Sequence, residues 1–317
     1  MDENESLGQL AVDQTPQQWL VNTVDDGRRL DVFLSAHLPQ FTRREVIEEI
    51  AAGRARINGH VSAKGSPVRP GDTVTLTSPL TFFPNPHLPI QILWTDDTLV
   101  VLNKPSGIPS VALRHSETAT VANFLLAHFP EATTASPRVL EAGIVHRLDT
   151  ATSGVLLAAR TTQTYGVLRK QFGKQIVQKQ YLALVHGQVS QPGTRRSLLA
   201  PAGRRGQRMH ELTTSNGQEA HTAYVPVSHF SNHTLIRVTI YTGVRHQIRV
   251  HLATLGYPIV GDTVYGPPGE NTRLCLHAET LSFLHPHTGA REHFTCPLPE
   301  DFQAAIRQVT GMVTPNC

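Results

Sequence analysis

A polar stretch interrupts the apolar middle of this sequence: His146-Arg147-Leu148-Asp149-Thr150-Ala151-Thr152-Ser153-Gly154. Ile144-Val145 precedes it, and residues 155–159 form an apolar run that predicts a strand. So many polar groups in one stretch would be costly to bury without hydrogen-bond partners. The stretch therefore indicates either a functional site at the edge of a sheet or an ordinary surface loop with turn chemistry, and the pattern alone favours neither.

A second stretch combines charge with a helical pattern: Thr242-Gly243-Val244-Arg245-His246-Gln247-Ile248-Arg249-Val250-His251. Apolar residues recur at helical spacing over residues 245–255, which predicts a helix there. Arg245 and Arg249 would share a face near its start, where two positive charges repel each other and oppose the helix dipole. This placement predicts an anionic partner, either a carboxylate such as Asp149 or an RNA phosphate. The alternative is an ordinary solvated basic face.

The N-terminal part of the chain has the pattern of a small mixed module. Apolar residues at helical spacing over residues 30–38 predict one helix, and Thr42 with Glu45 forms a capping-box pattern before a second helix over 43–52. Asn58-Gly59 predicts a hairpin, and residues 73–76 predict a short strand. Bases outnumber acids in this part, and arginines at the start of the second helix oppose its dipole. Either a polyanionic partner or a solvated face explains them.

Three further stretches carry less information by themselves: Lys179-Gln180-Tyr181-Leu182-Ala183-Leu184-Val185-His186-Gly187, Asn103-Lys104-Pro105-Ser106-Gly107, and Pro258-Ile259-Val260-Gly261-Asp262-x-x-Tyr265-Gly266. The first predicts a strand, in which a tyrosine usually serves packing. The other two predict loops. Residues 195–208 contain several arginines, including Arg204 and Arg205, and no acid, which predicts a basic loop.

The amino-acid composition limits the classes of protein that this sequence can belong to. The chain has 317 residues, is 39% hydrophobic and carries 28 Lys and Arg against 25 Asp and Glu, so it can bury a core and is not strongly basic. Its length favours two domains. The three cysteines lie far apart, which argues against a disulfide framework and for a reducing compartment. With no apolar run long enough to span a membrane and an acidic start unlike a signal peptide, we expect a cytoplasmic protein.

Several familiar enzyme signatures are absent from the sequence. It has no phosphate-binding G-x-x-x-x-G-K-[ST] loop, no G-x-G-x-x-G, no G-x-S-x-G and no H-E-x-x-H. Nucleotide hydrolysis, dinucleotide redox chemistry and serine-hydrolase chemistry therefore become less favoured. The cysteines and histidines of residues 275–296 lack the paired spacing of a zinc site, so we expect no metal and no cofactor.

The N-terminal motifs resemble a known RNA-binding module. Arg29-Leu30-Asp31-x-Phe33-Leu34, Thr42-Arg43-Arg44, Ile57-Asn58-Gly59 and Pro70-Gly71-Asp72 occur in the order found in the module named after ribosomal protein S-four. The resemblance implies that the module binds structured RNA. The bases that it would use are Arg43, Arg44, Arg54 and Arg56.

The remaining motifs, taken together, resemble the RluA-type pseudouridine synthases, which isomerise uridine in structured RNA. H-R-L-D-x-x-T-S-G is the strongest of them, followed by G-x-x-H-Q-I-R-x-H and G-x-P-I-x-G-D-x-x-Y-G. The resemblance implies that Asp149 is the catalytic aspartate, that Tyr181 stacks on the target base, and that Arg249 pairs with the aspartate. It further implies an RNA-binding role for a set of residues around the site: Arg147, Arg245, His246, Gln247, Arg204 and Arg205.

The sequence departs from the family pattern at two places. Thr150-Ala151 stands where the family commonly has a basic and then an acidic residue, and Val244 stands where it has an arginine. An arginine, Arg245, stands one position after Val244. These departures concern RNA contacts near the site and leave the three residues implied to act in catalysis unchanged.

The sequence thus predicts an α+β protein: a mobile acidic tail over 1–20, the RNA-binding module over 21–78, a Pro-rich linker over 79–89, and a mainly antiparallel catalytic domain with a central cleft over 90–317. We expect a monomeric isomerase that flips uridines out of structured RNA. Large-subunit ribosomal RNA is favoured by analogy. The alternatives are a transfer-RNA synthase, an inactive RNA-binding or chaperone protein, and a metal protein. Whether Asp149 acts as nucleophile or base stays open.

Overall fold

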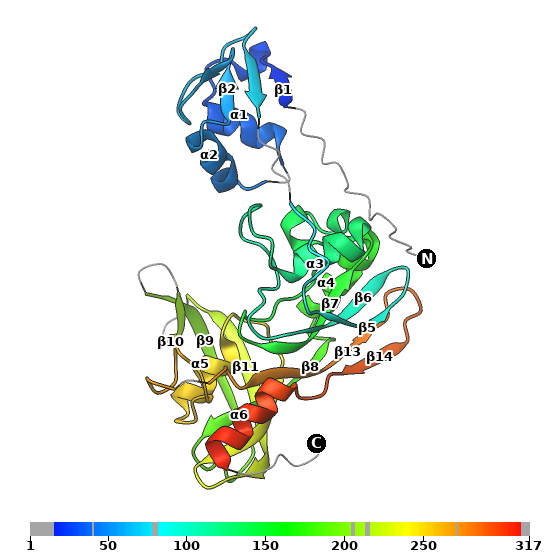
Figure 1. Ribbon diagram of the computed structural model, residues 1–317, viewed down its shortest axis with the longest axis vertical. Coiled ribbons are helices and arrows are strands. Elements are labelled where there is room, and N and C mark those ends of the chain that lie inside the picture. The colour runs from blue at the N-terminus through cyan, green and yellow to red at the C-terminus, as the bar shows by residue number, and fades with distance from the viewer. Residues whose placement is uncertain are drawn as a thin grey trace, which may run out of the picture. The chain divides into compact units, whose positions relative to one another are not determined.

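The computed structural model in Figure 1 describes residues 16–39, 41–77, 82–203, 207–212, 216–270 and 272–311. The chain divides into two compact units. The first contains Met1–Phe83 with Leu113–Thr118 and Pro137–Leu140, and the second contains the remaining residues. No helix in the described ranges is long and apolar enough to cross a membrane.

The first unit packs two helices against a small sheet. Its strand order is β1-β4-β2-β3. The elements are β1 (Gln17–Leu20), η1 (Thr23–Asp25), α1 (Leu30–His37), α2 (Arg43–Ala51), β2 (Ala55–Ile57), β3 (His60–Val61) and β4 (Thr73–Leu76). The predicted capping box of Thr42 and Glu45 is present, and Asn58 and Gly59 both have positive φ, as the hairpin turn requires. The core is formed by apolar residues of both helices and the strands, among them Leu30, Phe33, Leu34, Val46, Ile50 and Val74.

The prediction of a tail over residues 1–20 is wrong at its end, because residues 17–20 form β1 and pair with β4. Residues 1–15 lie outside the described residues. Of the predicted linker, residues 82–89 contain no helix or strand, and residues 78–81 lie outside the described ranges.

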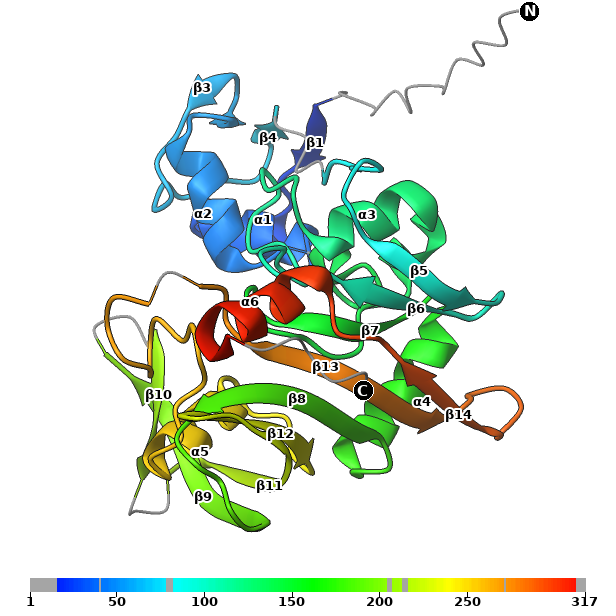
Figure 2. The ribbon, with the colours of Figure 1, turned by 60° about the horizontal axis from the view of Figure 1, so that its bottom comes forward.

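The second unit is built on a large sheet with the strand order β10-β9-β11-β12-β8-β13-β7-β6-β5, to which β14 adds beside β13 (Figure 2). Its strands are β5 (Gln91–Thr95), β6 (Leu99–Lys104), β7 (Ser153–Ala159), β8 (Gln178–His186), β9 (Gly193–Ala202), β10 (Arg208–Leu212), β11 (Gln218–His229), β12 (His233–Ile240), β13 (Leu276–Leu284) and β14 (Arg291–Thr295). All pairings between these strands are antiparallel except that of β13 with β7. This arrangement agrees with the predicted mainly antiparallel sheet.

Among the described residues, four α-helices and one short 3-10 helix accompany this sheet: α3 (Val121–His128), η2 (Pro130–Thr134), α4 (Thr162–Gly173), α5 (Gln247–Thr254) and α6 (Glu300–Thr310). The short helix η3 (Val139–Glu141) spans the boundary in the chain between the two units. α5 and α6 lie on opposite faces. His251 of α5 contacts Ser197, on the face that Tyr181 shares through the strand register. Phe302 of α6 packs against His277, which pairs with Leu182 on the other face.

The helix predicted over 245–255 begins two residues later than expected. His246 is its N-cap and has a left-handed backbone with φ of 56°, so α5 starts at Gln247. The cause is the Gln247 side chain, whose amide oxygen accepts hydrogen bonds from the Val244 N–H and the Thr242 hydroxyl and so folds residues 242–246 into a turn. Arg245 therefore lies on that turn and does not share a helix face with Arg249.

The basic segment over 195–208 is also not a loop as predicted. Most of it forms β9, which pairs with β10, and Arg195 makes two hydrogen bonds to the Glu211 carboxylate across that pair. Arg204 and Arg205 lie outside the described residues. Cys275 and Cys296 are buried free thiols, and Cys317 lies outside the described part of the chain.

Candidate active site

Asp149 lies on the turn that leads into β7, with a quarter of its side chain exposed. Its Oδ2 accepts a hydrogen bond from Arg249 Nη1 at 3.2 Å, and His246 Nε2 is 3.9 Å from the same oxygen. The predicted pairing of Asp149 with Arg249 is therefore present in the geometry. Residues far apart in the sequence lie close together here, because the turn before β7 lies next to the first turn of α5.

The strongest contact of Arg249 is with a different carboxylate. Its Nε and Nη2 donate to the two oxygens of Asp262, each at 2.7 Å, and the Asp262 side chain is completely buried. Burial would raise the pKa of Asp262, but the hydrogen bonds and charge of Arg249 outweigh it and lower that pKa. Burial likewise opposes the guanidinium charge, yet its two carboxylate partners raise the pKa of Arg249. Both members of the pair are ionised.

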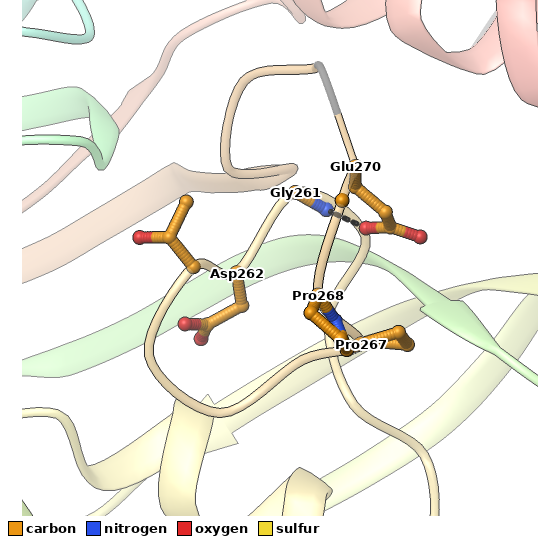
Figure 3. Close-up of a pocket in the computed structure, with 7 residues that line it drawn as sticks. Gly261, Asp262, Pro267, Pro268 and Glu270 are labelled. Carbon is orange, nitrogen blue, oxygen red and sulfur yellow. Dashed lines mark hydrogen bonds between the residues drawn. The ribbon is translucent and has the colours of Figure 1, made fainter.

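The conformation of the loop after α5 fixes the position of the Asp262 side chain. The Asp262 Oδ1 also accepts the backbone N–H groups of Val264 and Tyr265, and the Gly261 N–H donates to Glu270 Oε2 at 2.7 Å (Figure 3). Gly261 has φ of 76°, and a Cβ atom there would lie 1.9 Å from the Arg273 carbonyl oxygen. Only glycine fits this position. A cavity of about 250 Å³ opens beside this loop.

The backbone that carries Asp149 is fixed by the segment after β6. Ser110 Oγ accepts the Leu148 N–H and donates to the Leu148 carbonyl, and the Gly107 N–H donates to the Thr150 carbonyl at 2.8 Å. Ser106 Oγ donates to the carbonyl of the next residue in the turn. Backbone groups on both sides of Asp149 are thus held by one neighbouring loop.

Lys104 connects the same two segments. Its ammonium group donates to the carbonyl oxygens of Pro105, Ile108 and Thr150 at 2.9, 2.7 and 3.1 Å, and the side chain is fully buried. Burial lowers the pKa of Lys104 to about 7, against the opposing effect of the Asp149 charge. Sequence analysis placed this lysine in a turn-rich motif and gave it no role.

Tyr181 lies on β8 with 7% of its surface exposed. Burial and then the nearby Asp149 charge raise the pKa of Tyr181 well above its usual value, so the side chain is a neutral phenol at neutral pH. The effect of the Asp149 charge on this phenol places it near the aspartate, where the resemblance predicts a stacked base.

His146 has a structural position at the start of the polar stretch. Its Nε2 accepts the Leu157 N–H at 3.1 Å, and its ring stacks on Phe172. Burial, with smaller effects of Lys179 and Arg169, lowers the pKa of His146 to about 3. The neutral ring anchors the polar stretch to β7.

The residues predicted to bind RNA near the site differ in their exposure. Arg147 and Arg245 are exposed, and Arg245 Nη2 donates to the Arg208 carbonyl at 3.3 Å. His246 is half-buried beside Asp149. Gln247 is 2% exposed, and its amide nitrogen donates to the His221 carbonyl and Thr222 hydroxyl. The amide oxygen and nitrogen of Gln247 are thus both occupied within the protein, and the RNA contact that the resemblance implies for this residue stays a prediction.

In the first unit, the four predicted arginines all have partners within the module. Arg43 donates to the buried Asp31 at 2.7 and 3.1 Å, Arg44 pairs with Glu48, Arg54 pairs with Glu49, and Arg56 donates to the Gly59 carbonyl. Burial raises the pKa of Asp31, but Arg43 and then Arg29 outweigh it and lower that pKa. The arginine side chains remain between 43% and 80% exposed at the three ion pairs, so they are accessible to a phosphate.

Sequence analysis missed two residues that build this site, Asp262 and Lys104. Both belong to motifs quoted in the sequence analysis. The sequence alone does not show whether a carboxylate or a lysine in a turn-rich segment is buried. No group of three or more His, Cys, Asp or Glu in the described ranges is arranged to hold a metal ion.

The fold and the site define an RNA-modifying enzyme, and comparison with known proteins gives its class. The RNA pseudouridylate synthase family matches residues 98–254, and the S4 domain matches residues 28–74. The chain belongs to the RNA pseudouridine synthase family and carries an S4 RNA-binding domain in its N-terminal part. It is therefore an isomerase that acts on RNA, which confirms the resemblance, the class of enzyme and the fold class.

Individual relatives support this assignment. The chain is 36% identical to the ribosomal large subunit pseudouridine synthase D of Xanthomonas campestris pv. campestris, over 94% of each chain. It is 36% identical to an uncharacterized RNA pseudouridine synthase of Chloroflexus aurantiacus, over 92% of each chain. Among solved structures, human RNA pseudouridylate synthase domain containing 4 is similar with a TM-score of 0.54 and 25% identity, over 69% of this chain and 92% of that one.

Replacing Lys104 by Met should reduce both stability and catalysis, because three backbone carbonyls lose their donor and the Asp149 turn loses a restraint. We expect the free energy of unfolding to fall by about 1–3 kcal/mol. The rate of isomerisation in a single turnover should fall by about tenfold to a hundredfold, because the aspartate is displaced from its reacting position. The affinity for RNA should stay the same.

The difference in the free energy of unfolding between the wild type and Lys104→Met should depend on pH, and this dependence reports the charge state of Lys104. The pKa of Lys104 is about 7 in the fold, below the value of about 10.4 expected in the unfolded chain. The unfolded chain therefore binds an extra proton between these values, and the stability of the wild type relative to Lys104→Met should grow from about pH 7 to about pH 9. Urea denaturation at both values measures it. A constant difference would contradict the lowered pKa.

Proposed function

We propose that this enzyme isomerises specific uridines of large-subunit ribosomal RNA to pseudouridine, with Asp149 as its catalytic carboxylate. The observation that carries the proposal is the asymmetry of that carboxylate. Its Oδ2 contacts Arg249 and lies near His246, whereas Oδ1 has no hydrogen-bond partner in the part of the chain that the structure describes. A carboxylate held by one oxygen and open at the other is suited to attack or proton abstraction.

The reaction requires a carboxylate and no external reactant. The glycosidic bond to ring nitrogen one breaks, the base rotates, and ring carbon five bonds to the ribose. The proton on that carbon then leaves and ring nitrogen one takes up a proton, so that the product is an isomer of uridine. Neither oxidation nor hydrolysis occurs overall. Asp149 Oδ1 can serve as nucleophile or as base towards the ribose, and Arg249 keeps the carboxylate ionised and oriented in both cases.

Tyr181 would receive the target base. Flipping a uridine out of its stack costs a few kcal/mol, and stacking on an aromatic side chain returns about 1–3 kcal/mol. The buried phenol beside Asp149 can therefore offset most of that cost. Its raised pKa favours this stacking role over a role as a base in the resting enzyme.

Arginines of each unit would contact the RNA. We assign phosphate contacts to Arg43, Arg44, Arg54 and Arg56 of the S4 module, and to Arg147 and Arg245 near the site. The exposure of the arginines supports this assignment, and Arg43 is oriented by the buried Asp31. The segment with Arg204 and Arg205 follows β9 and is assigned on its charge alone.

Large-subunit ribosomal RNA is the favoured substrate because a relative at 36% identity over nearly the whole chain is a ribosomal large subunit pseudouridine synthase. Such a substrate would place the enzyme in the cytoplasm. A monomer is expected to suffice, since both carboxylates and the arginine of the site come from one chain.

Tritium release tests the activity and its substrate together. RNA carrying tritium at ring carbon five of uridine should lose tritium to water only when the enzyme forms pseudouridine. We expect release from unmodified large-subunit ribosomal RNA and none from transfer RNA. Asp149→Asn should abolish release while RNA binding persists.

Other outcomes of this assay separate the alternatives. Release with Asp149→Asn would contradict the proposed role of the aspartate. Release from transfer RNA alone would replace the proposed substrate. Tight binding without release from either RNA would favour an inactive RNA-binding protein.

Salt dependence tests the contribution of the S4 module. If Arg44 and Arg56 contact phosphates, the double variant Arg44→Gln with Arg56→Gln should lower the slope of log affinity against log salt by about 1.5, because each phosphate contact releases counterions. The matched control is Arg291→Gln with Arg307→Gln, which removes the same charge from β14 and α6. Equal slopes for the two double variants would contradict the assignment.

A further inference from the structure

A line of polar contacts leads from the backbone of β10 to the catalytic aspartate. The Met209 N–H donates to the Tyr265 hydroxyl oxygen at 2.7 Å, and that oxygen is 2.9 Å from His246 Nδ1. The other ring nitrogen, His246 Nε2, faces Asp149 Oδ2 at 3.9 Å. Tyr265 belongs to the G-D-x-x-Y-G motif and His246 to the H-Q-I-R motif.

The positions of the hydrogens in this line follow from what each group can do. A backbone N–H can only donate, so the Tyr265 oxygen accepts from Met209. The hydroxyl proton of Tyr265 then needs an acceptor, and His246 Nδ1 is the one within reach in the described structure. With the hydroxyl donating along this contact, and not accepting an Nδ1–H on its second lone pair, Nδ1 carries the lone pair. In a neutral imidazole the proton must then be on Nε2.

The surroundings keep the His246 ring neutral. Burial is the main cause that lowers the pKa of His246, and Arg249 and Arg245 act in the same direction. The charges of Asp149 and Asp262 oppose them without reversing the direction. The neutral ring therefore carries one proton, and the hydrogen bond with Tyr265 determines which ring nitrogen holds it.

From this geometry we infer that Tyr265 is a positioning residue that fixes His246 as the tautomer with its proton on Nε2, so that an N–H group faces Asp149. The inference rests on the proposed catalytic role of Asp149 and names two further residues that support it. In the other tautomer a nitrogen lone pair would face the carboxylate oxygen, which is electrostatically unfavourable.

The backbone at His246 supports a role beyond packing. Its φ of 56° is in the left-handed region, which residues with a side chain adopt in only a few per cent of cases. Gln247 imposes it here by holding residues 242–246 in their turn. The consequence is that Arg249 Nη1 and His246 Nε2 approach the same oxygen of Asp149 and leave Oδ1 open to the substrate.

Nitrogen NMR of histidine-labelled protein reads the tautomer directly. His246→Gln identifies the signals that belong to His246. In the wild type we expect the shift of a bare nitrogen for Nδ1 and of a protonated nitrogen for Nε2. Tyr265→Phe, which keeps the ring that Arg249 lies over, should move these signals towards the opposite tautomer or a mixture.

Tyr165→Phe is the matched control, because it removes a hydroxyl on α4 that contacts Glu141 and should leave the His246 signals unchanged. A wild-type His246 protonated on Nδ1 would overturn the inference. So would signals that are the same in Tyr265→Phe and the wild type. Neither result depends on activity, so this test can fail while the proposed role of Asp149 stands.

A double-variant cycle tests whether the tyrosine acts through the histidine. Tyr265→Phe should lower the single-turnover rate by at least about tenfold, as expected for a misplaced histidine tautomer, with unchanged affinity for RNA. In His246→Gln, whose amide has no tautomers, adding Tyr265→Phe should have almost no further effect. An equal rate loss in both backgrounds would show that Tyr265 acts by another route and would overturn the inference.

Discussion

The buried guanidinium of Arg249, held between two carboxylates, is the contact on which the rest of the site depends. Removing an arginine and an aspartate from water is costly unless every charge finds a well-placed partner. Asp262 meets this requirement with two short hydrogen bonds and full burial. Because these two bonds hold the guanidinium in place, its third nitrogen, Nη1, can donate to Asp149.

The surrounding structure can be understood as support for this contact. Glycine at position 261 lets the loop pass close to the Arg273 carbonyl, so that Asp262 arrives beneath α5. Gln247 sets where α5 begins and thereby the direction of Arg249. On the opposite side, Lys104 and its neighbours hold the backbone around Asp149. A carboxylate positioned from both sides loses little entropy when the substrate arrives, which is how positioning lowers a reaction barrier.

Much of this arrangement could be predicted from the sequence, and the failures have a common cause. Motif order pointed to the family, which the comparisons confirm, and to Asp149 and Arg249, which the structure brings into contact. Asp262 was overlooked because its importance comes from burial, which depends on a partner distant in the fold. Gln247 was assigned to RNA through the family resemblance, and the sequence did not show that its buried amide forms the turn before α5. Local patterns found the elements, but tertiary contacts decided which polar groups face the solvent.

The most direct test of this account is the single-turnover rate of Asp262→Asn on ribosomal RNA. Asp262 is completely buried, and its shortest link to Asp149 runs through the guanidinium of Arg249. The account predicts a folded variant with unchanged RNA affinity and a rate lowered at least about tenfold, because Arg249 loses its anchor and Asp149 its orientation. A folded variant that isomerises uridine at the wild-type rate would contradict it.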